Sequence, residues 1–339
     1  MNLRRCTLYV SVLCALVLGV ASCHKDDDTT TSDYFDGTLS FSVPSFVRPG
    51  ESYKLVPSGV TNPSGNGIGY FWLVSDIMSA NDTTKYYTDS NKVDSSFTFV
   101  APTTLGDYTV KCVAFADGYY DSSLSKSVTV VSSESITGNG ITSEDPSIID
   151  NREGDETEYF YMTAGNLLWL KQNVSYSKTG VSYENSPAMT KLFGNFYTWE
   201  QAKTACPDGW RLPTDAEWVS LAKSVDPTKD FKVGETFSGI GGNLMADIYF
   251  NSTKMWEYWP NVKITNSTGF AALPAGYAVI SDTDNKFHGV QEYAAFWTAD
   301  EFNADQAVYR YINVNQSDVL VGAADKSSFA ASLRCVKNK

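Results

Sequence analysis

Histidine is the scarcest chemically useful residue in this sequence, and its scarcity excludes several kinds of site. The 339 residues include only two histidines, His24 and His288, far apart in the chain. A serine or cysteine nucleophile needs a neighbouring base, most often histidine, and structural zinc sites need clustered cysteine and histidine. Neither arrangement is present in the sequence, and no carboxylate-pair motif stands out among the 39 acidic residues. We therefore expect a protein that is not an enzyme and carries no metal and no cofactor.

Clustered positive charge is also missing. Lysine and arginine number 26 against 39 acidic residues, which gives a formal net charge of −13. Binding to nucleic-acid phosphates requires grouped lysine and arginine, so we expect no nucleic-acid partner. Hydrophobic residues make up 42% of the chain and aromatic residues 14%, which is enough to form real cores and excludes wholesale disorder.

The sequence contains a single long apolar run, close to residue 1. Two arginines precede the run 6–21, and Cys23 follows shortly after it. The run is shorter than the roughly 20 residues that span a bilayer, so residues 1–22 are expected to be a cleaved signal peptide. The Val-Ala-Ser-Cys sequence that ends at Cys23 resembles the lipobox of bacterial lipoproteins, in which the cysteine is lipidated. An ordinary signal peptide followed by an incidental cysteine is the alternative.

Residues 23–36 are expected to form a lipidated, flexible tether. The tether begins His-Lys-Asp-Asp-Asp after Cys23, which resembles the export signal of Bacteroidetes surface lipoproteins. We expect a lipid anchor in the outer membrane with the protein displayed at the cell surface. The periplasmic leaflet is the alternative location.

Residues 37–132 alternate apolar and polar side chains in short runs separated by glycine, proline, asparagine and aspartate. This pattern predicts an antiparallel β-sandwich. Trp72 lies where an immunoglobulin-like domain has its core tryptophan, and Gly106–Val110 resembles a turn of polycystic-kidney-disease-type (PKD) modules. No earlier strand offers a partner for Cys112, so we expect a buried free thiol. The expected strands are 39–47, 52–56, 69–74, 96–100, 108–115 and 125–131.

Residues 133–157 are rich in serine, glycine, asparagine and acidic residues and have no apolar periodicity. We expect a linker or a loose wrapping segment here.

Residues 158–339 are expected to form a second unit. Two motifs that mark the start of a helix stand out in it. Thr198 with Gln201, and Thr214 with Glu217, have the spacing of capping boxes. They predict one helix over 199–206 and a second helix that starts after Thr214. The remaining expected elements are short strands at 268–277, 295–298, 307–314 and 328–336.

Several blocks of this second unit resemble the Fibrobacter succinogenes major paralogous domain family. In order, the blocks are Trp169–Asn173, Tyr197–Ala202, Cys206–Trp218, Gly269–Tyr277, Phe296–Ala299 and Ser332–Val336. The family is related to the C-type-lectin-like fold and has no established general activity, so the resemblance implies a fold and no reaction. That fold implies a disulfide between Cys206 and Cys335, with two independent thiols as the alternative. The expected fold class is therefore mostly β: an immunoglobulin-like β-sandwich followed by an α+β, C-type-lectin-like domain with two short helices.

Aromatic side chains are the candidate ligand-binding residues, because they stack on sugar rings and also carry polar edges. The densest cluster contains Trp256, Tyr258 and Trp259. A second cluster surrounds a polar loop and contains Tyr277, Asp282, Asp284 and Tyr293. Burial in a core is the alternative for the rings, and a solvated loop is the alternative for the two aspartates. The sequence lacks the sugar-binding motifs of calcium-dependent C-type lectins.

These patterns lead to two hypotheses about function. The first is a non-catalytic surface lipoprotein whose distal domain binds a glycan or a host or envelope protein. The second is a structural or assembly component of the envelope or fimbriae that has no small ligand.

Overall fold

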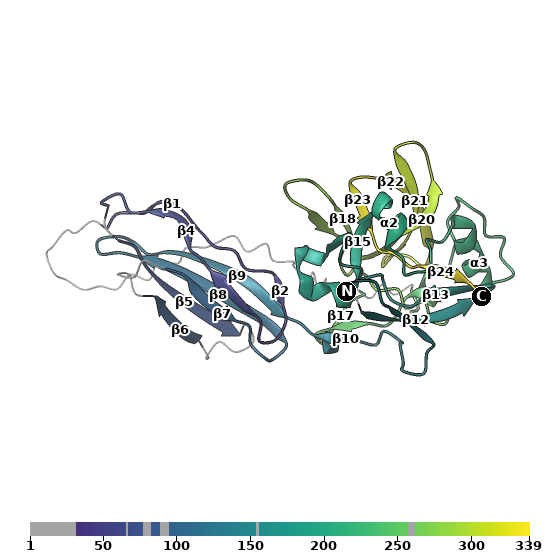
Figure 1. Ribbon diagram of the computed structural model, residues 1–339, viewed down its shortest axis with the longest axis horizontal. Coiled ribbons are helices and arrows are strands. Elements are labelled where there is room, and N and C mark those ends of the chain that lie inside the picture. The colour runs from purple at the N-terminus through teal and green to yellow at the C-terminus, as the bar shows by residue number, and fades with distance from the viewer. Residues whose placement is uncertain (1–31, 66, 77–82, 89–94, 154–155, 257–261) are drawn as a thin grey trace, which may run out of the picture.

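Figure 1 shows a computed structural model of the chain, which describes residues 32–339 except 66, 77–82, 89–94, 154–155 and 257–261. The signal peptide, Cys23 and most of the tether lie outside the described residues. Two β-rich units follow one another along an elongated molecule (Figure 1). The prediction of a mostly β chain is confirmed. Within the described ranges, no helix is both long enough and apolar enough to cross a bilayer.

The N-terminal unit consists of one large sheet and two small ones. Its strands are β1 (Asp36–Ser40), β2 (Phe46–Val47), β3 (Ser52–Leu55), β4 (Ser58–Thr61), β5 (Gly69–Asp76), β6 (Thr83–Thr88), β7 (Phe97–Val100), β8 (Gly106–Phe115) and β9 (Ser122–Val130). The large sheet has the order β2-β9-β8-β5-β6, and β1-β4 and β3-β7 form separate pairs. Five of the six predicted strands are present with shifted ends. The expected strand 39–47 is instead the end of β1 and the separate strand β2, which lie in different sheets, and the pattern missed β4 and β6.

One apolar core fills this unit. Alternation along β8 directs Tyr108, Val110 and Cys112 inward, where they meet side chains from β1, β3 and β7. Trp72 is fully buried and packs edge-on against Phe41 with ring centroids 5.0 Å apart. Cys112 is a buried free thiol, as the sequence predicted.

The stretch 133–157 is more ordered than its composition suggests. It contains the short 3-10 helix η1 (Ser133–Ser135), β10 (Ile136–Thr137) and β11 (Ser147–Asp150). Strand β10 pairs with β16 (Tyr249–Phe250), and β11 pairs with β12 (Thr157–Ala164). These pieces have two to four residues, too short to produce a visible period, and the two strands belong to sheets of the distal unit.

The distal unit combines small sheets with short helices. Its other strands are β13 (Leu167–Leu170), β14 (Val181–Ser182), β15 (Asn195–Thr198), β17 (Thr253–Lys254), β18 (Tyr277–Val279), β19 (Lys286–His288), β20 (Tyr293–Glu301), β21 (Gln306–Asn313), β22 (Val319–Asp325), β23 (Phe329–Ala331) and β24 (Val336–Asn338). The helices are η2 (Tyr183–Asn185), η3 (Pro187–Met189), α1 (Thr190–Phe193), α2 (Trp199–Ala205), α3 (Asp215–Val225) and α4 (Gly241–Leu244). The main sheets are β11-β12-β13-β24, β14-β15-β23-β18-β19 and β20-β21-β22.

Both predicted capping boxes are present. The Thr198 hydroxyl accepts a hydrogen bond from the Gln201 N–H at the start of α2, and the Gln201 side chain accepts one from the Thr198 N–H. Thr214 and Glu217 form the same reciprocal pair at the start of α3. Local sequence therefore fixes where both helices begin.

A disulfide joins Cys206, just after α2, to Cys335, just before β24, with the two Cα atoms 5.8 Å apart. This confirms the pairing that the family resemblance implied. The bridge lies in a core cluster with Trp199, Trp210 and Leu333. It fixes the end of the chain to the first half of the unit.

Arg334, the neighbour of that cysteine, is fully buried, and no carboxylate among the described residues pairs with it. Its guanidinium donates to the Asn173 side chain and to backbone oxygens of Lys171, Phe270 and Ala271. The segment 268–277, expected to be a strand, is largely a loop held by these bonds, with Ala271 at a φ of 55°. Its apolar residues face a core, and before Tyr277 its backbone pairs only in isolated bridges, at Ala272 and Gly276, which explains why the pattern resembled a strand.

The two units touch through a small interface. Ser186, which is fully buried, accepts a hydrogen bond from the Phe46 N–H and donates one to the Phe46 carbonyl. The Phe46 ring packs against Tyr183 and Phe250, with centroids 5.6 and 6.3 Å away. These contacts of Phe46 join the distal unit to the first.

Candidate functional site

The structure brings together two aromatic residues that the sequence proposed as ligand-binding. Tyr277 lies on β18 and Tyr293 begins β20, and their rings meet at right angles with centroids 6.3 Å apart. Both side chains are half-buried. Each ring therefore keeps part of its surface accessible.

Three further rings, which sequence reasoning missed, complete a closed circuit with these two. Phe329 on β23 lies 5.1 Å from Tyr277 and 4.9 Å from Tyr309 on β21. Tyr309 lies 5.5 Å from Tyr311, and Tyr311 lies 6.2 Å from Tyr293. Each of the five rings thus contacts two others.

The five rings line a hollow of about 400 Å³, which we call the tyrosine pocket. Ala295 and Ala324 are the other residues that line it, and their small side chains leave room between the rings. Among the described residues, none that lines this pocket is charged. Its polar side-chain groups are the four tyrosine hydroxyls.

Strand alternation explains why the tyrosines share one face of the β20-β21-β22 sheet. Tyr309 and Tyr311 are two residues apart on β21, so their side chains lie on the same face. Arg310 between them points to the other face, where it pairs with Asp215. Gly322 lies directly opposite Tyr309 on β22, and a Cβ there would lie 2.7 Å from the tyrosine ring. A side chain at Gly322 would therefore push the ring out of place.

The pocket favours protonated hydroxyls. Burial raises the pKa of Tyr309, and the neighbouring hydroxyls of Tyr311, Tyr277 and Tyr293 raise it further. Burial and Tyr293 likewise raise the pKa of Tyr311. At neutral pH these hydroxyls both donate and accept hydrogen bonds. The pocket can therefore offer apolar ring surface and neutral polar groups together.

The polar loop beside the pocket does not contribute side chains to its lining. It connects β18 to β19, and its Asp282 and Asp284 are both exposed. Asp284 pairs with Lys286, while the Ser281 hydroxyl donates to the Asp284 carbonyl at 2.7 Å. No group of three or more potential metal ligands occurs within the described part of the chain. The two aspartates therefore belong to an exposed loop at the edge of the site.

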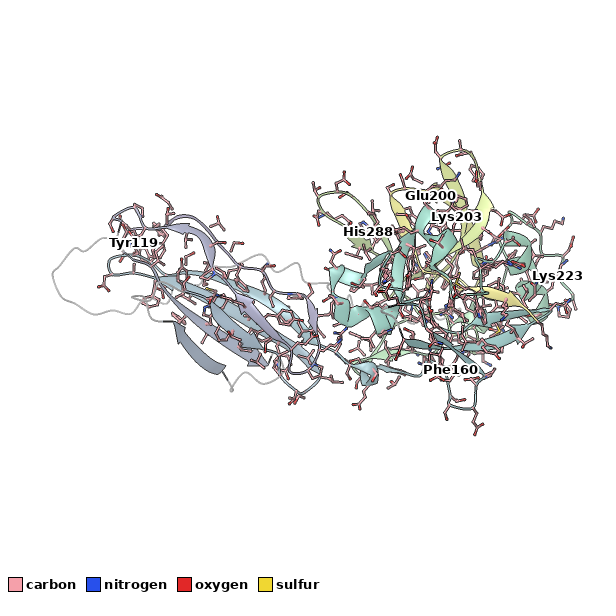
Figure 2. All side chains as sticks on the ribbon, in the orientation of Figure 1. Tyr119, Phe160, Glu200, Lys203, Lys223 and His288 are labelled. Carbon is pink, nitrogen blue, oxygen red and sulfur yellow. A yellow bond between two sulfur atoms is a disulfide. The ribbon has the colours of Figure 1, made fainter. Side chains whose placement is uncertain are left out.

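His288, labelled in Figure 2, lies on the strand that follows this loop. Its ring is 5.4 Å from that of Tyr277 and is exposed. It borders the pocket from outside.

In the other aromatic cluster, which contains Trp256, Tyr258 and Trp259, the structure describes Trp256 alone, and that residue is not at the surface. Trp256 is fully buried among Met255, Ile248 and other side chains of the main core of the distal unit. It offers no ring face to a ligand, so the structure removes it from the candidate site. A short run alternates in the same way whether its rings face a core or a ligand, which is why the pattern misplaced it. Tyr258 and Trp259 lie outside the described residues.

These features define a β-rich, two-unit chain whose distal unit carries an uncharged, tyrosine-lined pocket. The family model of the Fibrobacter succinogenes major domain (Fib_succ_major) matches residues 162–337, just over half of the chain. The chain therefore belongs to this family. The matched region includes all five rings of the pocket, the disulfide and Arg334. No curated protein is detectably similar to the chain.

Proposed function

We propose that this chain is a lipid-anchored protein of the outer cell surface that binds glycans through the tyrosine pocket, without catalysis. The observation that carries the proposal is the circuit of five aromatic rings around an uncharged hollow of about 400 Å³. Sugars present apolar C–H faces and hydroxyl edges. Aromatic rings with polar tips complement both surfaces at once.

The size and chemistry of the pocket fit one or two sugar units. Small-molecule sites are mostly apolar hollows of roughly 300–1,000 Å³ with a few convergent polar groups. The four hydroxyls supply those groups, and no buried charge has to be desolvated when a neutral ligand enters. The ring contacts among Tyr277, Phe329 and Tyr309 hold the site in shape before a ligand arrives.

The N-terminal unit acts in this proposal as a spacer with an immunoglobulin-like architecture. Asp33 donates its N–H to the Gly118 carbonyl and accepts from the Tyr120 N–H, which fixes the start of the described chain to that loop. Figure 2 places Tyr119, in the same loop, at the end of the unit that points away from the distal unit. About ten residues separate Cys23 from Asp33, a reach of at most about 35 Å. An acyl chain on Cys23 would therefore hold the molecule by the end opposite the pocket.

The distal unit supplies the lectin-like part of the proposal. The Cys206–Cys335 bridge ties the end of α2 to the start of β24, and long loops connect small sheets. This arrangement supports a C-type-lectin-like fold whose binding uses tyrosines in place of calcium.

Glycan binding by the full chain tests the proposal. The full chain, purified in detergent, is applied to an array of neutral and anionic glycans, and affinities for any ligand found are measured by calorimetry. Tyr277→Ala and Tyr309→Ala should each lower the affinity at least tenfold, because each removes a ring from the circuit. Tyr120→Ala is the matched control, since it removes a tyrosine that is 53% exposed on the other unit.

Two outcomes would contradict the proposal. One is binding that survives both pocket variants, and the other is no binding to any glycan. The second outcome, together with co-purifying envelope proteins, would favour a structural or assembly role.

A further inference from the structure

Strand β22 is the outermost strand of the β20-β21-β22 sheet. One of its edges pairs with β21 along the whole strand, with Tyr309 opposite Gly322. Among the described residues, the other edge is covered only at its beginning. There the backbone of Phe237 exchanges two hydrogen bonds with Val319, at 2.8 and 3.0 Å.

The remaining part of that edge carries free backbone groups. Because Val319 directs its N–H and carbonyl outward, Val321 and Ala323 direct theirs outward as well, while Gly322 faces β21. In the described ranges, the outward groups of Val321 and Ala323 have no hydrogen-bond partner. The edge therefore offers two donors and two acceptors in strand geometry.

This edge lacks the usual protection against pairing with another chain. Natural edge strands are commonly interrupted by proline, lysine, a bulge or an inward charge. Residues 319–324 read Val-Leu-Val-Gly-Ala-Ala, and their pairing with β21 has a continuous register. The strand is regular, apolar and uncharged up to Asp325.

A hollow of about 380 Å³ lies on the face of the sheet opposite the tyrosine pocket and reaches this edge; its lining combines apolar side chains with the carboxylates of Asp215, Asp300 and Glu301. Val308, Val321 and Ala323 are among the residues that line it. Phe302 and Val233 also line it and are 64% and 59% exposed, which leaves large apolar surfaces in water. A side chain opposite Val321 on an added strand would lie on this same face.

Acidic groups border the edge, so a partner segment with positive charge would be favoured. They are Asp300, Glu301, Asp305, Asp318 and Asp325. Lys326 lies in the same border, and its ammonium is bound to Glu301 and to loop carbonyls. The lysines of the nearby 226–235 segment pair with aspartates of that same segment. The border therefore keeps an excess of negative charge.

We infer that the β22 edge binds an extended segment of a partner protein, which joins the sheet as an added strand. The segment has apolar side chains at alternate positions, which cover Phe302 and Val233, and lysine or arginine next to them. Main-chain hydrogen bonds to Val321 and Ala323 hold the segment, and the hollow selects its side chains. A second copy of this chain fits poorly, because it would bring the same acidic border and its own charge of −13. This surface is separate from the proposed glycan site.

Peptide selection tests the inference. The full chain is used to select binders from a phage-displayed library of random twelve-residue peptides. We expect enrichment of sequences with alternating apolar residues beside lysine or arginine. Ala323→Pro removes the outward N–H and places a proline ring at an edge position that tolerates proline, so it should weaken the enriched peptides at least tenfold. Ala323→Ser is the matched control, because it changes the side chain, keeps the N–H and should bind like the parent.

Amide hydrogen exchange by NMR provides the second measurement. The amides of Val321 and Ala323 should exchange fast in the free chain and become at least tenfold slower with the selected peptide. The amide of Gly322, already bonded to β21, should change little. The inference is overturned if no peptide is enriched, if the enriched peptides bind Ala323→Pro as tightly as the parent, or if exchange at both outward amides is unchanged.

Discussion

The N-terminal unit and the distal unit hold their chains together in different ways. In the N-terminal unit, strands such as β5, β8 and β9 pair over eight or more residues, and their alternating side chains fill one core. In the distal unit many strands have only two to four residues, and the chain between them runs in loops. Those loops are held by a disulfide, by Arg334 and by the ion pair of Arg310 with Asp215.

The two units therefore differ in how their sequences determine their folds. In the first unit, side chains that face the core alternate with side chains that face away from it, strand after strand. Substitution of one side chain therefore leaves most of this pattern intact. The distal unit depends on a few links between distant positions, because short strands bury too little surface to fix the loops. Loss of one link should therefore affect the distal unit alone, and the two units should unfold in separate steps.

Removing the disulfide should produce the largest effect. Cys206 and Cys335 are 129 positions apart, and closing a loop of that length stabilises a protein by about 4–5 kcal/mol in the chain-entropy model. The double variant Cys206→Ala, Cys335→Ala should lower the unfolding midpoint of the distal unit in calorimetry. The transition of the N-terminal unit serves as the internal control. Equal shifts of both transitions, or none, would contradict the comparison.

Breaking the buried ion pair should come next. Arg310 and Asp215 are both buried, their side chains meet at 2.5 and 2.8 Å, and the Gly234 N–H also donates to Asp215. Arg310→Met leaves the carboxylate buried without its cation, so we expect the distal unit to lose about 3–5 kcal/mol. Denaturant unfolding with a distal tryptophan signal measures this loss.

The matched control for that variant also replaces Asp215 with leucine. Removal of both charges should recover part of the lost stability, since no unpaired charge then remains. A double variant as unstable as Arg310→Met alone would show that the pair is not what stabilises this region.

Alkaline pH should produce a smaller effect in the N-terminal unit, through Cys112. Burial raises the pKa of Cys112 to about 12. The unfolded chain releases the thiol proton near pH 9, while the folded unit keeps it up to about pH 12. The stabilisation is complete below pH 9 and decreases as the pH rises, by about 2 kcal/mol between pH 9 and 10.5. Cys112→Ala should flatten this slope in unfolding measured across that range, and an unchanged slope would refute the account.

The parts of the fold that local sequence encodes were predictable. Thr198 with Gln201 and Thr214 with Glu217 marked both helix starts, because a capping box depends on residues three positions apart. No local sequence motif predicts contacts between residues that are far apart in the chain. Arg310 meets Asp215 across 95 positions, and Phe329 meets Tyr277 only because β23 pairs with β18.

Only part of the candidate site could be predicted from local sequence. Tyr277 and Tyr293 were found because they flank a polar loop. Tyr309 and Tyr311 were overlooked although the predicted strand 307–314 already placed them on one face; the available signal was the Tyr-Arg-Tyr alternation. Trp256 was misplaced because alternation in a short run gives the faces of a strand without saying which face is buried.

The most direct measurement of the central claim is tyrosine-ring NMR on the full chain with selectively labelled tyrosine. As a glycan found on the array is added, the ring signals of Tyr277, Tyr293, Tyr309 and Tyr311 should shift together along one saturation curve. Signals of Tyr119 and Tyr120 should stay in place. If every glycan that binds leaves the four pocket rings unchanged, the tyrosine pocket is not the binding site.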